Sequence, residues 1–491
     1  MALQQSVAEV ATRGILWSIA QNWGGRAFTF VLFIVLARFL TPTDFGLASA
    51  AALVLMLIAM VAELGFGDAI VQRKDLTAAD INLPFFVSVG CSVALAITTI
   101  FLSKRIEKWL SVAELSPVLI AVCITAPLST VSMFQEVNYR RHFAFRQLAF
   151  RVFIANLIAG PLAIACALMG GGVWSLVVQS YVTVVVSLIW LWKSPYWVPS
   201  LVLEWSKFRQ LSRFGISVVS MRLIGFVSLR FVEFIIVARF GVAAFGLYAA
   251  GSRIYFTMLY MLQTSLTDVS LAVLSKISDD RERTLNAYEQ AITLAATTTS
   301  PLFVFTAALS PEICDVLLGS KWNGVSTLAQ PLLLLGALQC VQFLNGSYLS
   351  ARGRPSWVLV TVISKMVAVV LCLSFVPTKD VIGLVTVFVV AQLVEIPFSY
   401  WFVARDLQYP LASIFKILAP AFISNAVAFV AVQLMRHLIE GVIPWSLALG
   451  AVLGLVYVLV YLTALSLTGR AQINQVKVFV LNRVKGLRPS S

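Results

Sequence analysis

The sequence predicts an all-α polytopic membrane protein of about fourteen transmembrane helices, with two parallel six-helix lobes around a central cavity and a C-terminal helix pair. Of its 491 residues, 60% are apolar and only 12% are charged, whereas about 25% of residues are charged in ordinary soluble domains. The mean hydropathy is +0.91, and no extended polar segment interrupts it. These values exclude a soluble globule and leave no room for a sizeable extramembrane domain.

A helical span needs about 20 mainly apolar residues. Segments of this kind are centred near residues 27, 58, 92, 126, 158, 182, 227, 260, 297, 338, 366, 392, 425 and 455. Because their number is even, both termini are expected on the same side of the membrane.

The distribution of basic residues indicates which side this is, because Lys and Arg are enriched in cytoplasmic loops. One face of the predicted bundle receives few of them, namely Arg38, Lys104, Arg105, Lys108, Arg239, Lys321, Lys379 and Arg436. The other face carries both termini and the basic clusters at residues 140–151 and 207–213, so both termini are predicted to be cytoplasmic. The excess of 36 Lys and Arg over 22 Asp and Glu thus indicates topology, and no nucleic-acid partner is expected.

An internal repeat defines the lobes. LARFLTPTDFGL, which begins at Leu36, matches VARFGVAAFGL, which begins at Val237. The match aligns Arg38 with Arg239 and, after one gap, Gly46 with Gly246. Six spans separate the copies, so both loops face the same side and the halves are parallel repeats. For the two arginines, helix termination is the preferred interpretation.

The repeat and the polar stretches divide the chain into five parts. The division is 1–200 for the N-terminal lobe, 201–213 for a cytoplasmic amphipathic linker, 214–405 for the C-terminal lobe, 406–469 for the additional helix pair, and 470–491 for a basic amphipathic tail. The tail and the opening dozen residues are expected to lie on membrane lipid, with a dedicated partner site as the alternative.

Basic residues inside the spans are candidates for substrate binding, because a charge within a membrane is costly unless it faces a wet cavity or a partner. They are Arg26, Arg222, Arg230, Arg253 and Lys365. Guanidinium binds phosphate as a permanently charged fork, so these residues favour an anionic headgroup. The alternative is internal pairing, for example between Arg230 and Glu233 at i, i+3.

Acidic residues inside the spans are the candidates for proton or cation coupling. They are Glu63, Asp68, Glu233, Asp268 and Glu395. Asp68 and Asp268 are related by the repeat and lie near span ends, so capping or loop pairing would also explain them. Glu233 sits deeper, beside Arg230 and on the same helix face as Arg222, so its protonation could release arginines to the substrate.

The sequence offers little support for an enzyme. His142 and His437 have no nucleophile or metal partner at useful spacing, and no catalytic residue is predicted. The six cysteines are scattered singly, without the spacing of a metal site. No Gly-rich phosphate loop follows a strand, so neither a nucleotide module nor another cofactor is expected.

The opening stretch, RFLTPTDFGL, and ELGFGDAIVQRKDLT resemble the Wzx-type polysaccharide flippases of the multidrug/oligosaccharidyl-lipid/polysaccharide exporter superfamily. The resemblance is clearest over residues 1–160. It implies alternating access by two six-helix lobes that move undecaprenyl-diphosphate-linked oligosaccharide across the bacterial inner membrane, for lipopolysaccharide or exopolysaccharide biosynthesis. It also implies a cationic cavity and, as partners, a polysaccharide polymerase and chain-length machinery.

Other functions make different demands on the sequence. A multidrug exporter of the same superfamily would need unpaired carboxylates for cationic drugs, and a lipid II-type flippase would share the cationic cavity. A membrane-embedded polymerase or glycosyltransferase would need a large outer loop with acidic residues, and a structural envelope protein would need no charges at mid-membrane.

Overall fold

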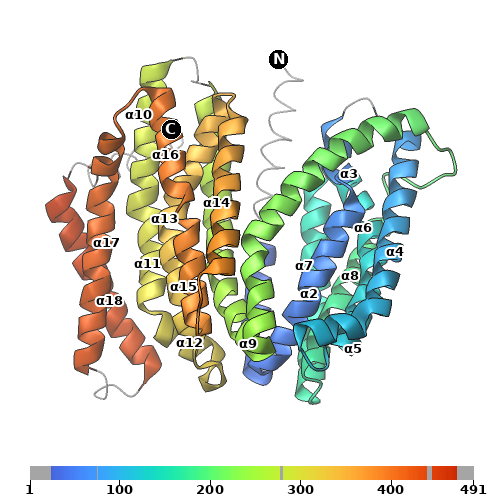
Figure 1. Ribbon diagram of the computed structural model, residues 1–491, viewed down its shortest axis with the longest axis horizontal. Helices are drawn as coiled ribbons and strands as arrows, with labels where there is room; N and C mark the ends of the chain where they lie inside the picture. The colour runs from blue at the N-terminus through green and yellow to red at the C-terminus, as the bar shows by residue number, and fades with distance from the viewer. Residues whose placement is uncertain (1–23, 74–75, 277–279, 440–444, 471, 473–491) are drawn as a thin grey trace, which may run out of the picture. The chain divides into compact units, whose positions relative to one another are not determined.

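The computed structural model describes residues 24–73, 76–276, 280–439, 445–470 and 472, and within these ranges the ordered elements are helical. The chain forms two compact units, Met1–Ala249 and Ala250–Ser491. Figure 1 shows the long helices of each.

Unit 1 opens with a helix over residues 24–39. Its further helices are α2 (Pro42–Glu63), α3 (Phe66–Gln72), α4 (Ala78–Leu110), α5 (Leu115–Cys123), α6 (Thr125–Arg141), α7 (Phe145–Leu168) and α8 (Val173–Lys193). The next helix, α9 (Trp205–Lys276), runs from unit 1 into unit 2, and its helical geometry breaks at Gly241, where φ is 81° and ψ is 178°.

Unit 2 continues with helices of varied length. They are α10 (Arg281–Leu294), the π-turn η1 (Ala295–Thr299), α11 (Ser300–Ala308), α12 (Ser310–Leu318), the 3₁₀ turn η2 (Ser320–Trp322), α13 (Val325–Ala351), α14 (Pro355–Phe375), α15 (Val381–Gln392), α16 (Glu395–Leu407), α17 (Leu411–Ile439) and α18 (Ser446–Thr468).

The predicted all-α membrane fold is confirmed. Among the described residues, 11 helical segments are long and apolar enough to cross a membrane, and each contains one predicted span centre. The other three predicted centres, near residues 27, 227 and 260, fall in the helix over 24–39 and on either side of the break in α9. The total of about fourteen spans stays a prediction.

Both copies of the repeated motif form a helix, a break and a second helix. In the first copy, α2 begins with a capping box, in which the Thr41 side chain accepts a hydrogen bond from the Asp44 backbone N–H and Asp44 bonds back to Thr41. Pro42 occupies the first turn, where its missing N–H costs nothing. In the second copy, the positive φ of Gly241 makes the break, which a residue without Cβ adopts readily.

The α2–α3 junction is a second sharp break. Leu64 and Gly65 both have left-handed backbones, with φ of 49° and 69°, so the chain turns within two residues and α3 starts at once. A buried aromatic cluster holds this region. It contains Phe66 of α3, Phe85 of α4, Phe134 of α6 and Trp197, and Trp197 donates its indole N–H to the Ala78 carbonyl at 2.9 Å.

The C-terminal helix pair is joined to the rest of unit 2 by polar contacts. Arg436 of α17 donates twice to the Glu312 carboxylate of α12, at 2.8 Å each. Tyr457 of α18 donates to Asn425 of α17, which in turn donates to Ser300. Such bonds between helices fix which faces meet in an apolar surrounding.

Parts of the prediction lie outside the described residues. They include the opening dozen residues and nearly all of the 470–491 tail. The Asp268 side chain also lies outside the described part of the chain.

Candidate substrate site

Arg222 of α9 bridges two carboxylates near the α2–α3 junction. Its Nη1 contacts Glu63 Oε2 at 2.7 Å, and its Nη2 contacts Asp68 Oδ2 at 2.8 Å. Glu63 is the last residue of α2, and Asp68 lies in the first turn of α3. We call these three side chains the Arg222 cluster.

Close backbone packing positions the cluster. A Cβ placed on Gly215 would lie 2.1 Å from the Leu64 carbonyl oxygen, and one on Gly65 would lie 2.4 Å from the Gly215 carbonyl oxygen. Only glycine allows this approach of α9 to the junction. Arg222 follows Gly215 by about two helical turns, which brings its guanidinium to Glu63 and Asp68.

The Arg222 cluster carries one positive and two negative groups, a net charge of −1 when all are ionised. The side chains are partly exposed: Arg222 by 37%, Glu63 by 19% and Asp68 by 44%. Arginine stays charged in proteins. Another anion can take the two N–H donors that meet the carboxylates by replacing those carboxylates, or after they take up protons.

A second ion pair lies further along α9. Arg230 donates to Glu233 one turn away, and the Glu233 side chain is only 4% exposed. This is the internal pairing that the sequence offered as the alternative for Arg230. Glu233 was also expected to line up with Arg222, but the structure gives Arg222 its own two acidic partners.

Unit 2 holds a further predicted pair. Lys365 of α14 contacts Glu395 of α16 at 2.6 Å, and both side chains are largely buried. Thus a residue predicted to bind substrate and one predicted to couple an ion neutralise each other. Arg253, on the second part of α9, is half-buried, whereas Arg26 of the first helix is exposed. Convergence of Arg26, Arg222 and Arg253 on one site stays a prediction.

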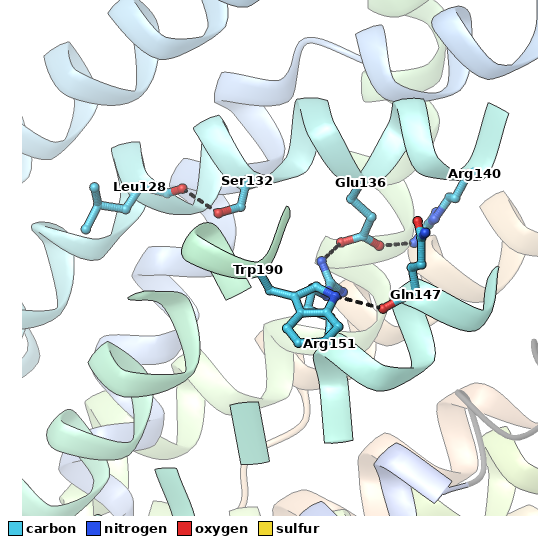
Figure 2. Close-up of polar contacts among 7 residues, drawn as sticks. All are labelled: Leu128, Ser132, Glu136, Arg140, Gln147, Arg151 and Trp190. Atoms are coloured by element: carbon cyan, nitrogen blue, oxygen red, sulfur yellow. Dashed lines mark hydrogen bonds and ion pairs between the residues drawn. The ribbon is translucent and has the colours of Figure 1, made fainter. Parts of the chain in front are cut away.

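Sequence reasoning missed an ion pair that ties α6 to α7 (Figure 2). Glu136 of α6 accepts from Arg151 of α7 at 2.5 Å and from Arg140, one turn away on its own helix. Arg151 had been counted only within a basic loop cluster, but its side chain is 12% exposed. The i, i+4 spacing of Glu136 and Arg140 was the available signal.

A buried polar column also lies between α13 and the α15–α16 pair. Along α13, Gln339 donates to Gln392 at 3.2 Å and Asn345 donates to Ser399 at 3.0 Å. At the end of α16, Asp406 accepts from residues at or just beyond the end of α13; they are Tyr348, Arg352 and Arg354. The hydrogen bond to Asp406 raises the pKa of Arg352, and both arginines form ion pairs with Asp406.

A bundle of apolar helices with ion pairs inside its spans is typical of a polytopic membrane transporter. A family model described as "Polysaccharide biosynthesis protein" matches residues 35–327, and the chain belongs to this family.

Relatives with described roles agree with this membership. The chain is 24% identical over 372 residues to the succinoglycan biosynthesis transport protein ExoT of Rhizobium meliloti (strain 1021), covering 74% of each chain. It is 19% identical over 355 residues to the lipopolysaccharide biosynthesis protein WzxC of Escherichia coli (strain K12), covering 71% of each.

Solved structures show the same fold. The lipid II flippase MurJ in an inward closed conformation superposes with a TM-score of 0.70 at 13% identity, covering 94% of this chain and all of MurJ. An inward-facing multidrug transporter of the MATE family superposes with a TM-score of 0.59 at 15% identity, covering 80% of this chain and 96% of the transporter. The protein is therefore a multi-pass membrane transporter of polysaccharide biosynthesis and not an enzyme.

Proposed function

We propose that the protein moves undecaprenyl-diphosphate-linked oligosaccharide repeat units across the bacterial inner membrane by alternating access. The product would serve lipopolysaccharide or exopolysaccharide biosynthesis, and both termini would be cytoplasmic. Family membership supports the pathway class. The observation that carries the substrate assignment is the Arg222 cluster, in which a guanidinium near the end of a span contacts two carboxylates.

A lipid diphosphate fits this arrangement. Each Nη of Arg222 meets a separate carboxylate, and a diphosphate presents two adjacent phosphates with oxygens suited to the same fork. The substrate would thus replace both acids in one step.

This exchange links binding to protonation. When Glu63 or Asp68 takes up a proton, its hold on Arg222 weakens and the diphosphate competes better. By reciprocity, bound diphosphate makes each acid easier to protonate. Proton coupling through the Arg222 cluster therefore belongs to the proposal, with Glu233, Asp268 and Glu395 as further candidate acids.

The remaining predicted contacts belong to the same proposal. Arg26 and Arg253 would bind the headgroup, with Arg230 and Lys365 available once their acidic partners are neutralised. The lobes would be residues 1–200 and 214–405. A polysaccharide polymerase and chain-length machinery would be partners that receive the product.

Reconstitution tests the function directly. Purified protein in proteoliposomes should expose undecaprenyl-diphosphate-linked oligosaccharide to a lectin added outside, at a rate well above that of empty liposomes. Lipid II and a fluorescent cationic drug serve as rival substrates. Faster transport of either rival than of every oligosaccharide lipid tested would contradict the proposal.

A further inference from the structure

The two copies of the loop motif pack against each other through glycines. Gly46 lies four residues after Pro42, where α2 begins, and Gly246 lies four residues after Val242, which follows the break in α9. A Cβ on Gly46 would lie 2.0 Å from the Val242 carbonyl oxygen, and a Cβ on Gly246 would lie 1.8 Å from the Pro42 carbonyl oxygen. Each glycine thus meets the carbonyl that lies four residues before the other glycine, so the contact is reciprocal.

This reciprocal contact, which we call the glycine crossing, admits no other residue at either position. Both approaches are to backbone oxygens, which cannot move aside as a flexible side chain would. Buried aromatic side chains hold the helices in place: Phe45 packs edge-to-face on Phe33 at 5.3 Å, and Phe245 is 1% exposed. The crossing is therefore a defined fit between two repeat-related elements.

The forces at the crossing suit a contact that opens and closes. It is made of glycine Cα groups against carbonyl oxygens, and contacts of this kind are individually weak. The opposite end of α2 differs, since the charged Arg222 cluster joins it to α9 there. Thus α9 contacts both ends of α2, through backbone at the beginning of α2 and through ion pairs at its end.

We propose that the glycine crossing is the seal that closes the outer end of the transport path, and that it parts when the protein opens outward. The inference rests on the proposed alternating access. In a transporter made of two parallel repeats, opening at one face requires the repeats to separate there. The crossing joins repeat-related residues at the face that the charge pattern places outside.

Cysteine labelling tests the seal without a transport measurement. Leu40, beside the crossing, is 1% exposed, so Leu40→Cys in a background without the six native cysteines should react slowly with an impermeant maleimide added outside. Adding Gly46→Ala or Gly246→Ala should raise the labelling rate at least tenfold, because the closed fit cannot form. Gly225→Ala is the matched control, since a Cβ there meets nothing within 4 Å.

A second measurement, on protein with both glycines intact, keeps the proposal testable if the alanine variants fail to fold. With both glycines intact, labelling of Leu40→Cys should rise when undecaprenyl-diphosphate-linked oligosaccharide is supplied inside the vesicles. Labelling that stays slow in folded Gly46→Ala overturns the seal, and so does labelling that ignores substrate in a protein that transports it. Fast labelling in the alanine variants, without transport of any oligosaccharide lipid by the native protein, supports the seal and removes the proposed function.

Discussion

Exchange of anions at Arg222 makes a quantitative prediction about single substitutions. If the diphosphate must displace Glu63 and Asp68, removing either acid should tighten its binding, whereas removing Arg222 should weaken it. A purely structural cluster predicts the opposite for the acids, because each loss would disturb the packing of α9 on α2 and α3. The sign of the effect therefore decides between the two roles.

The structure sets the magnitudes. Hydrogen bonds to charged groups contribute about 1.5–3 kcal/mol when buried, and exposed ion pairs contribute about 0–1 kcal/mol. The ion pair of Arg222 with Glu63, whose side chain is 19% exposed, should contribute about 2 kcal/mol. The ion pair with Asp68, whose side chain is 44% exposed, should contribute about 1 kcal/mol. Glu63→Gln should thus tighten diphosphate binding about thirtyfold and Asp68→Asn about fivefold. Arg222→Gln should weaken it about a hundredfold, since two charge-assisted bonds are lost.

Equilibrium binding of undecaprenyl diphosphate to protein in nanodiscs measures these changes. Arg73→Gln is the matched control, because Arg73 also joins the end of α3 to α9, through Gln210 at 3.0 Å, but contacts neither acid in the described structure. Arg222→Lys should bind with intermediate strength, since it keeps the charge and loses the fork. Weaker binding by Glu63→Gln and Asp68→Asn, or native binding by Arg222→Gln, would refute the exchange.

A periplasm-only reporter fused after Ser491 should be inactive and one inserted near Lys321 active, and the reverse pattern would overturn the topology. Glu395→Gln should lower the free energy of unfolding by about 3 kcal/mol, because it leaves Lys365 buried and unpaired. In a melting assay, the Lys365→Met/Glu395→Leu double variant should recover most of that stability. An equal loss of stability in the single and double variants would argue against a buried pair. An imposed pH gradient should accelerate flipping by the native protein but not by Glu233→Gln if that buried acid couples transport, and equal acceleration would remove it from the coupling role.

Local patterns were enough to predict the helical fold. Hydropathy along about 20 residues specifies a span regardless of the rest of the chain. The cap at Thr41 and Asp44 was not predicted, although it also depends on neighbours only three residues apart. The repeat between residues 36–47 and 237–247 was legible for the same reason, since each copy encodes its own helix, break and helix.

The sequence could also identify the charged residues inside spans as candidates for the site, because the free-energy cost of a charge in the membrane can be judged from residue type. It could not choose their partners. Arg222 meets acids that are 159 and 154 residues away, and Gly46 meets a carbonyl near the break in α9. Such contacts depend on which helices pack together and at what distance, and no short-range period encodes that. The sequence by itself determined the membrane helices, the repeat and the candidate charges, and only the tertiary structure decided which charges neutralise each other and where backbone meets backbone.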